Sequence, residues 1–333
     1  MANINKFSKD LVNEILNSEQ IFLLPHIYAD IDTLSSCFAM GEILKKLNKK
    51  AYIIFGDDIN KIDDSAKLII SCISNYIEFI LPNDLEKKRS DKDLFITLDV
   101  NKKDLISIKD FKDTDTIIVI DHHNIDKNTL KAKYKYIDLT ASSASEIIFN
   151  LYNCMDFNYN EILSNCLLAG IYLDTNKLYN INNYKTFIAV SELIKNGADL
   201  RAVQKLFIGN FDNDRKVHNL INKKEDLINN IAICIADDDI FYTRAELAKS
   251  ADYLIKFGYD AVFVVGYIEK NLISISARSN GNINVCNIMR KFDGGGTFTS
   301  SAARIENSNL NDIKDKIIKI VKKGIVREYE KRY

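Results

Sequence analysis

The sequence predicts an α/β protein with a mainly parallel sheet in its N-terminal part, joined by a helical linker to a smaller α/β domain. Apolar runs of strand length alternate with helical patterns from about residue 20 to residue 175. Strand-like runs resume near residue 231, after a polar helical stretch. The length of 333 residues is sufficient for two separate cores.

The first domain is expected to span residues 1–185. Short apolar runs predict strands at residues 21–24, 51–55, 94–98 and 116–120. Apolar residues at helical spacing predict helices at residues 33–47, 142–152 and 160–173. Strands that alternate with helices in this way imply a parallel sheet covered on both faces.

A helical linker is expected over residues 186–226, and the second domain over residues 227–333. Its strands are predicted at residues 231–236, 261–267 and 272–277, and its helices at 244–257 and 285–292. A loop of three glycines, Gly294, Gly295 and Gly296, follows. A basic amphipathic helix then begins at residue 310, and we interpret its charged face as a solvated surface.

Composition excludes several classes of function. Lysine and arginine total 45 against 46 acidic residues, so the chain has no basic field for a long nucleic acid. A short nucleotide remains possible as a partner. No apolar stretch is long enough for a membrane span, and the N-terminus lacks the apolar core of a signal peptide. The six cysteines are widely spaced, which disfavours zinc and disulfides. We therefore expect a cytoplasmic protein with no membrane partner.

Ionisable side chains directly follow several of the apolar runs. They are His26, Asp30, Asp32, Asp99, Asp121, His122, His123 and Asp174. Parallel strands bring their carboxyl ends to one edge of a sheet, where ligands bind. Carboxylates and imidazoles suit divalent metal ions. The alternative is a set of polar loops, with an aspartate capping the next helix. Three of the four histidines lie in these motifs, which favours a metal site.

The ordered set of motifs resembles the DHH phosphoesterase superfamily. In the first half it comprises the histidine and aspartates after residue 25, the Asp121-His122-His123 triplet, and the segments 141–146 and 170–175. In the second half, residues 275–279, 283–285 and the three glycines resemble the DHH-associated substrate-binding domain. Within the family, the chain is most similar to the catalytic core of GdpP-type cyclic di-AMP phosphodiesterases, without the membrane helices and sensory modules that precede that core.

The resemblance implies a role for each residue at an active site between the two domains. One Mn²⁺ would be held by His26, Asp30 and Asp99. The other would be held by Asp32, Asp99, His122 and Asp174, with Mg²⁺ or another divalent ion as the alternative. Asp121 would orient a metal-binding imidazole, and His123 would face the scissile phosphate. Arg278 and Ser279 would grip a phosphate, and the remaining substrate contacts would be Asn284, Gly294, Gly295, Gly296 and Thr297.

The implied reaction is hydrolysis of cyclic di-AMP to linear pApA, by in-line attack of a hydroxide that bridges two metals. The family usually has histidine where this chain has Thr297, which affects substrate contact and leaves the metal set intact. One alternative is a nanoRNase or phosphatase acting on pApA, short oligonucleotides or 3′-phosphoadenosine 5′-phosphate. A second, less favoured alternative is a nucleotide sensor that no longer catalyses. A homodimer is possible.

Overall fold

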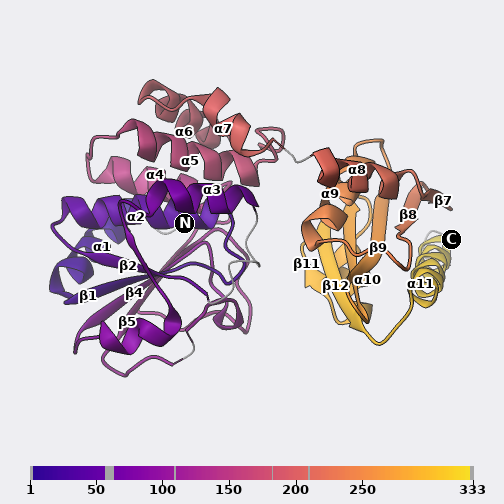
Figure 1. Cartoon of the computed structure of the whole chain (residues 1–333), viewed down its shortest axis with the longest axis horizontal. Helices are drawn as coiled ribbons and strands as arrows, with labels where there is room; N and C mark the ends of the chain where they lie inside the picture. The colour runs from indigo at the N-terminus through magenta and orange to yellow at the C-terminus, as the bar shows by residue number, and fades with distance from the viewer. Residues whose placement is uncertain (1–2, 57–63, 109, 182, 209–210, 331–333) are drawn as a thin grey trace. The chain divides into compact units, whose positions relative to one another are not determined.

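The computed structural model describes residues 3–56, 64–108, 110–181, 183–208 and 211–330. The chain divides into two compact units, Met1–Ile208 and Gly209–Tyr333 (Figure 1). Each unit has its own sheet and its own buried apolar core. We describe the two units separately.

The first unit contains a six-stranded sheet in the order β3-β2-β1-β4-β5-β6, in which every paired strand is parallel. Its strands are β1 (Gln20–Leu24), β2 (Ala51–Ile54), β3 (Glu78–Ile80), β4 (Asp93–Leu98), β5 (Thr116–Asp121) and β6 (Tyr134–Ile137). The chain runs outward from β1 to β3, and then returns to place β4 on the other side of β1. The carboxyl ends of β1 and β4 therefore lie at the point where the strand order reverses, which is where open α/β sheets bind ligands.

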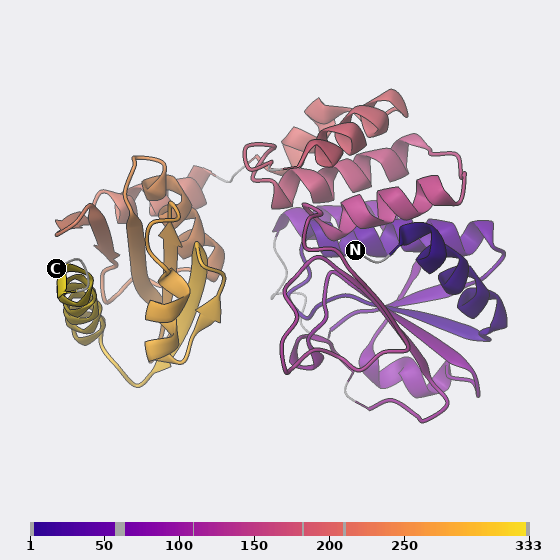
Figure 2. The ribbon, with the colours of Figure 1, turned by 180° about the vertical axis from the view of Figure 1, so that it is seen from behind.

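Helices cover one face of this sheet (Figure 1 and Figure 2). They are α1 (Ile4–Asn17), α2 (Ile31–Lys46), α3 (Asp64–Ile73), α4 (Ala144–Cys154) and α5 (Glu161–Asp174). The other face has a smaller core around Phe22 and Phe95, with η2 (Pro82–Lys87) and η3 (Lys103–Leu105) nearby in the chain. Both faces are covered, as predicted, but the second is covered by loops and the short 3₁₀ turns η2 and η3, which contribute Leu85 and Leu105 to its core.

The segment expected to be a linker is divided between the two units. Helices α6 (Tyr184–Lys195) and α7 (Leu200–Leu206) bury Leu193 and Val203 in the core of the first unit. Helix α8 (Phe211–Ile221) buries Leu220 in the core of the second. The structure therefore places the division after residue 208. The apolar faces of these helices explain the difference, since each must be buried against a core.

The second unit contains a mixed sheet in the order β11-β12-β10-β9-β8-β7. Only β8 and β9 pair in parallel among the described strands of this sheet. The strands are β7 (Lys224–Leu227), β8 (Ile231–Ile235), β9 (Ala261–Glu269), β10 (Leu272–Ser279), β11 (Gly295–Gly296) and β12 (Ser300–Glu306). Besides α8, its helices are α9 (Arg244–Ile255), α10 (Val285–Met289) and α11 (Leu310–Glu330), with the 3₁₀ turn η4 (Arg290–Phe292) after α10. No described helix is both long and apolar enough to cross a membrane.

The three glycines do not form the open loop that was expected. Gly295 and Gly296 pair with β12, a strand that the sequence analysis did not identify. A Cβ on Gly294 would lie 2.6 Å from the Cβ of Ala303, and one on Gly296 would lie 2.6 Å from the Cα of Ser301. These two glycines are therefore needed for close packing against β12, whereas a Cβ on Gly295 would meet open space.

A buried ion group fixes the amino end of β4. The Arg89 side chain is 3% exposed and contacts Asp115 and Asp93, with Nε 3.2 Å from Asp93 Oδ2. We expect Arg89→Ala to lower the free energy of unfolding by about 3–5 kcal/mol, because it leaves buried carboxylates unpaired. Urea denaturation would measure this loss. Lys87→Ala, which breaks an exposed pair with Asp84, is the control and should change stability little. Equal losses in the two variants would contradict the prediction.

Candidate metal centre

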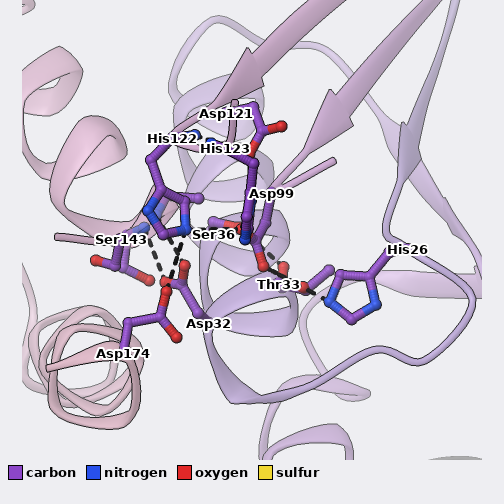
Figure 3. Close-up of polar contacts among 12 residues, drawn as sticks. His26, Asp32, Thr33, Ser36, Asp99, Asp121, His122, His123, Ser143 and Asp174 are labelled. Atoms are coloured by element: carbon purple, nitrogen blue, oxygen red, sulfur yellow. Dashed lines mark hydrogen bonds and ion pairs between the residues drawn. The ribbon is translucent and has the colours of Figure 1, made fainter. Parts of the chain in front are cut away.

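Asp99 lies at the centre of the ionisable cluster in the first unit (Figure 3). It follows β4 directly and has a left-handed backbone conformation, with φ of 61°. Its N–H donates to the carbonyl of Ile120 on the neighbouring strand (3.0 Å). Its Oδ2 accepts a 2.6 Å hydrogen bond from the Thr33 hydroxyl of α2. Aspartate tolerates this conformation better than most residues, and backbone strain of this kind is often found at functional sites.

One set of possible metal ligands comprises His26, Asp30 and Asp99, whose ligand atoms lie within 4.8 Å of one another. His26 Nε2 is 3.7 Å from Asp30 Oδ2 and 3.6 Å from Asp99 Oδ2. Asp30 also serves as the N-cap of α2, since its Oδ1 accepts from the Thr33 N–H. Asp30 can therefore cap α2 through Oδ1 and still offer Oδ2, which faces His26, to a metal ion.

A second set comprises Asp32, His122 and Asp174, whose ligand atoms also lie within 4.8 Å of one another. His122 Nε2 is 3.1 Å from Asp174 Oδ2 and 3.2 Å from Asp99 Oδ1. Asp99 therefore contacts both sets. Figure 3 shows it between His26 on one side and His122 with Asp174 on the other.

The Asp32 carboxylate is fully buried and is held by the start of α4. The N–H groups of Ala144 and Ser145 donate to its two oxygens at 2.7 and 2.9 Å. Gly170 on α5 makes room for this arrangement, because a Cβ there would lie 2.5 Å from Asp32 Oδ1 and would collide with the Ser145 hydroxyl. The N-terminus of α4 thus favours a negative charge at Asp32.

Asp121 arranges the loop that carries the paired histidines. Its Oδ1 accepts from the backbone N–H groups of His122 and His123, and lies 2.8 Å from His123 Nδ1. We expected this carboxylate to orient a metal-binding imidazole, but the ring it contacts in the structure is that of His123. Because a carboxylate only accepts, the proton of this bond resides on His123 Nδ1. The His123 side chain is 56% exposed, so its Nε2 can reach a ligand.

The electrostatics of the cluster favour cations. Burial lowers the pKa of His26, but Asp30 and Asp99 outweigh burial and raise it to about 10. Burial, together with the charge of Asp99, raises the pKa of Asp174 to about 6. Burial and the charge of Asp174 likewise raise the pKa of Asp32. Negative charges that oppose one another in a buried site are stabilised when a metal ion binds.

Two buried ligand atoms are in ion-pair contact but lack a well-formed hydrogen bond. Asp99 Oδ1 and His122 Nε2 lie 3.2 Å apart, and neither makes a hydrogen bond of good geometry within the described part of the chain. Buried polar atoms without such a bond cost free energy unless a further partner satisfies them. The donor set of imidazole and carboxylate groups fits divalent ions such as Mn²⁺ or Mg²⁺. The residues present therefore fit a divalent metal site.

Metal affinity should rise with pH. In the metal-free protein His26 keeps its proton up to a pKa of about 10, and a bound metal must displace this proton. One proton released per ion gives roughly a tenfold gain in affinity per pH unit between pH 6 and pH 8. Calorimetric titration of Mn²⁺ in buffers of different ionisation enthalpy measures the release. An affinity independent of pH would contradict the prediction.

In the metal-free protein, His26 makes the stability of the fold decrease with pH, whereas metal affinity increases with pH. The folded-state pKa of His26 lies above the ordinary value of 6.5, so its ion pairs stabilise the fold fully below that pH. This contribution is lost as pH rises through about 10. Thermal unfolding in a chelator should therefore show this part of the stability falling with pH, while the stabilisation by added metal grows.

The predicted substrate residues all lie in the second unit. Arg278, Gly294, Gly295 and Gly296 line a cavity of about 570 Å³ in this unit. The other three make local contacts. The Ser279 hydroxyl accepts from the Gly281 N–H, Asn284 caps α10, and Thr297 closes a turn with Ser300. Several further residues of the cavity wall were not predicted from the sequence, among them Arg244, Ser274, Ser276 and Arg304.

Comparison with known proteins adds independent information. Residues 20–171 match the model of the DHH family, N-terminal domain, and residues 229–323 match the DHHA1 domain. The chain is 28% identical to a membrane protein–large ribosomal subunit bL9 fusion protein of Onion yellows phytoplasma (strain OY-M), over 99% of this chain and 39% of that protein. It is 28% identical to the cyclic-di-AMP phosphodiesterase GdpP of Bacillus subtilis (strain 168), over 93% of this chain and 48% of that protein. The chain thus spans half or less of the length of these relatives.

A solved structure gives the same result for the fold. An exopolyphosphatase-related protein from Bacteroides fragilis superposes with a TM-score of 0.79 and 16% identity, over 94% of this chain and 95% of that chain. At this identity the likeness concerns the fold alone. The two matched domains occupy the two units of the structure in order. The chain therefore belongs to the DHH family, with a DHH N-terminal domain followed by a DHHA1 domain.

Proposed function

We propose that this protein is a metal-dependent phosphodiesterase that hydrolyses cyclic di-AMP to linear pApA. The observation that carries the proposal is the Asp99-centred cluster, in which one buried carboxylate contacts two sets of ligand atoms. A relative named for this activity, matching 93% of the chain, supports the choice of substrate. We take Mn²⁺ as the metal because imidazole ligands accompany the carboxylates.

The ligand sets suggest a division of roles. His26, Asp30 and Asp99 would hold one ion, and Asp32, Asp99, His122 and Asp174 the other. Divalent ions there would supply Lewis acidity, which stabilises charge on a phosphate and lowers the pKa of a water molecule. The N–H groups that hold Asp32 and the hydroxyl that holds Asp99 keep these carboxylates in place before substrate arrives.

His123 is suited to contact the substrate. Burial lowers the pKa of His123, but the hydrogen bond to Asp121 and the charge of Asp99 outweigh it and raise the pKa. A protonated imidazole, fixed through Nδ1, presents its Nε2–H to an anionic group. His123 would thereby stabilise the negative charge that develops on the phosphate in the transition state. In the second unit, Arg278 would bind a phosphate group of the substrate.

Product analysis by chromatography tests the proposal. The purified protein with Mn²⁺ is incubated separately with cyclic di-AMP, pApA and 3′-phosphoadenosine 5′-phosphate. Accumulation of pApA from the cyclic substrate is the expected result, and it would show that Thr297 is compatible with this activity. Cleavage of the linear substrates alone would instead identify a nanoRNase-type enzyme. Binding without turnover of any substrate would identify a sensor.

A further inference from the structure

Asp252 and Arg278 form a geometrically defined pair beside the cavity of the second unit. Asp252 lies on α9 and Arg278 on β10. Arg278 Nε donates to Asp252 Oδ1 at 2.6 Å, and Nη2 donates to Oδ2 at 3.4 Å. Arg278 Nη1 donates to the carbonyl of Ala277 at 3.1 Å. The guanidinium is therefore held from two directions.

These contacts leave a defined part of the guanidinium for a ligand. An arginine has five N–H donors in a rigid fork, and the three bonds above use one on each nitrogen. One N–H on Nη1 and one on Nη2 are not used by these bonds to the described residues. These two donors form the end of the fork, which matches two oxygens of a phosphate.

Arg278 is part of the wall of the cavity, and its partner Asp252 is not. Ala248, one helical turn before Asp252, and Ser276, two residues before Arg278, are small and also line it. These small side chains take up little of the cavity beside Arg278. A ligand in the cavity would therefore contact Arg278, which lines it, and not Asp252, which does not.

Neither the stability of helix α9 nor the stability of the fold explains why residue 252 is an aspartate. Asp252 lies in the last turn of α9, where the helix dipole disfavours negative charge. Its side chain is 47% exposed, and pairs this exposed contribute little to stability. A negative charge near a phosphate site would also repel the ligand. A role in orienting Arg278 explains why an aspartate is found here despite the unfavourable helix position, the small gain in stability and the repulsion of a phosphate.

We propose that Asp252 is a positioning residue, which orients Arg278 for a two-point grip on a phosphate group of the nucleotide. This inference rests on the proposed function, because it concerns the nucleotide substrate of the same enzyme. It makes a prediction of definite sign. If Asp252 acted only through its charge, its removal would strengthen phosphate binding. If it positions Arg278, its removal weakens binding.

Binding to the whole 333-residue chain, with divalent metal removed by a chelator, provides the test. The probe is pApA, titrated calorimetrically at fixed salt. We expect Asp252→Ala and Asp252→Asn each to weaken binding about tenfold, because the guanidinium loses its fixed orientation. Arg278→Ala should weaken binding at least as much. The double variant Asp252→Ala, Arg278→Ala should bind no more weakly than Arg278→Ala alone.

The matched control is Asp238→Ala, which removes the same charge from an exposed position of the same unit. It should leave binding within twofold of wild type, or slightly stronger. In the Mn²⁺-loaded enzyme, Asp252→Ala should raise KM about tenfold and change kcat much less. Circular dichroism of each variant checks that the fold is retained.

Three outcomes would overturn the inference. They are unchanged or tighter binding by both Asp252 variants, losses that multiply in the double variant, and failure of the wild-type protein to bind pApA. The binding test needs no turnover, so it separates the two proposals. Weaker binding by the Asp252 variants, in a protein that hydrolyses none of the nucleotides, would reject the proposed function and keep the positioning role.

Discussion

Asp99→Asn should abolish phosphodiesterase activity, with a fall in kcat of about 10³-fold or more. The asparagine keeps the size of the side chain and tolerates the left-handed backbone that this position requires. It removes the charge that faces both His26 and His122. Loss of several kcal/mol of metal-dependent stabilisation corresponds to about three orders of magnitude in rate. Steady-state assays with saturating Mn²⁺ measure the fall.

Metal analysis and a matched control variant show whether the loss of activity in Asp99→Asn comes from loss of bound metal. Asp99→Asn should retain less bound metal than wild type by elemental analysis after gel filtration, and circular dichroism should show that it keeps its fold. Its stability in a chelator should fall, because the charge that pairs with His26 and His122 is lost. Asp126→Asn, at an exposed pair with Lys102, removes the same charge from the same unit and should keep full activity. An active Asp99→Asn enzyme with normal metal content would disprove the central role given to this carboxylate.

The cluster could be predicted from the sequence because strand ends determine position in a parallel sheet. Each of Asp99 and Asp121 follows an apolar run, and the topology brings such residues to one edge. The division of the ligands into two sets came from the family resemblance and not from their spacing in the sequence. The structure brings all six predicted metal ligands into two groups whose ligand atoms lie within 4.8 Å of one another. Their proximity was thus predictable, although their binding of metal stays a prediction.

Other features depend on tertiary contacts that leave no local pattern. The left-handed conformation of Asp99 arises where β4 meets β5 and α2, and nothing in its neighbouring sequence indicates it. The contact between Asp121 and the ring of His123, not that of His122, depends on how the loop turns. The glycine segment appeared to be a loop because its partner strand β12 has small and polar residues that obscure its strand pattern.

The sequence of β10 contains a pattern that could have identified part of the cavity wall in the second unit. Ser274, Ser276 and Arg278 alternate along β10 and therefore lie on one face of the sheet. Alternation identifies the face, but it does not reveal which helix packs above it. The pairing of Asp252 with Arg278 crosses 26 residues and depends on the packing of α9 against β10. Sequence spacing carries no information about that packing.

Gly170→Ala tests whether the close approach of α5 to the start of α4 is required by the metal centre. An alanine Cβ would lie 2.8 Å from the Cβ of Ser145 and 2.5 Å from Asp32 Oδ1. Neither group can retreat easily, because Asp32 is held by the N–H groups of Ala144 and Ser145. We expect a destabilisation of about 1–3 kcal/mol from overpacking, and at least a tenfold loss of metal affinity.

The control for this substitution is another helical glycine that lies away from the site. Gly41 is in α2, and a Cβ there would meet only the flexible end of the Ile77 side chain, at 2.7 Å. Gly41→Ala gains about 1 kcal/mol of helix propensity, which offsets a small shift of Ile77. Both variants make the same chemical change within a helix, so propensity alone predicts that both stabilise the protein. The collision with Ser145 and Asp32 makes Gly170→Ala lose stability, and displacement of Asp32 makes it lose metal as well. Denaturation and Mn²⁺ titration of the two variants therefore separate the packing effect from the role of Asp32.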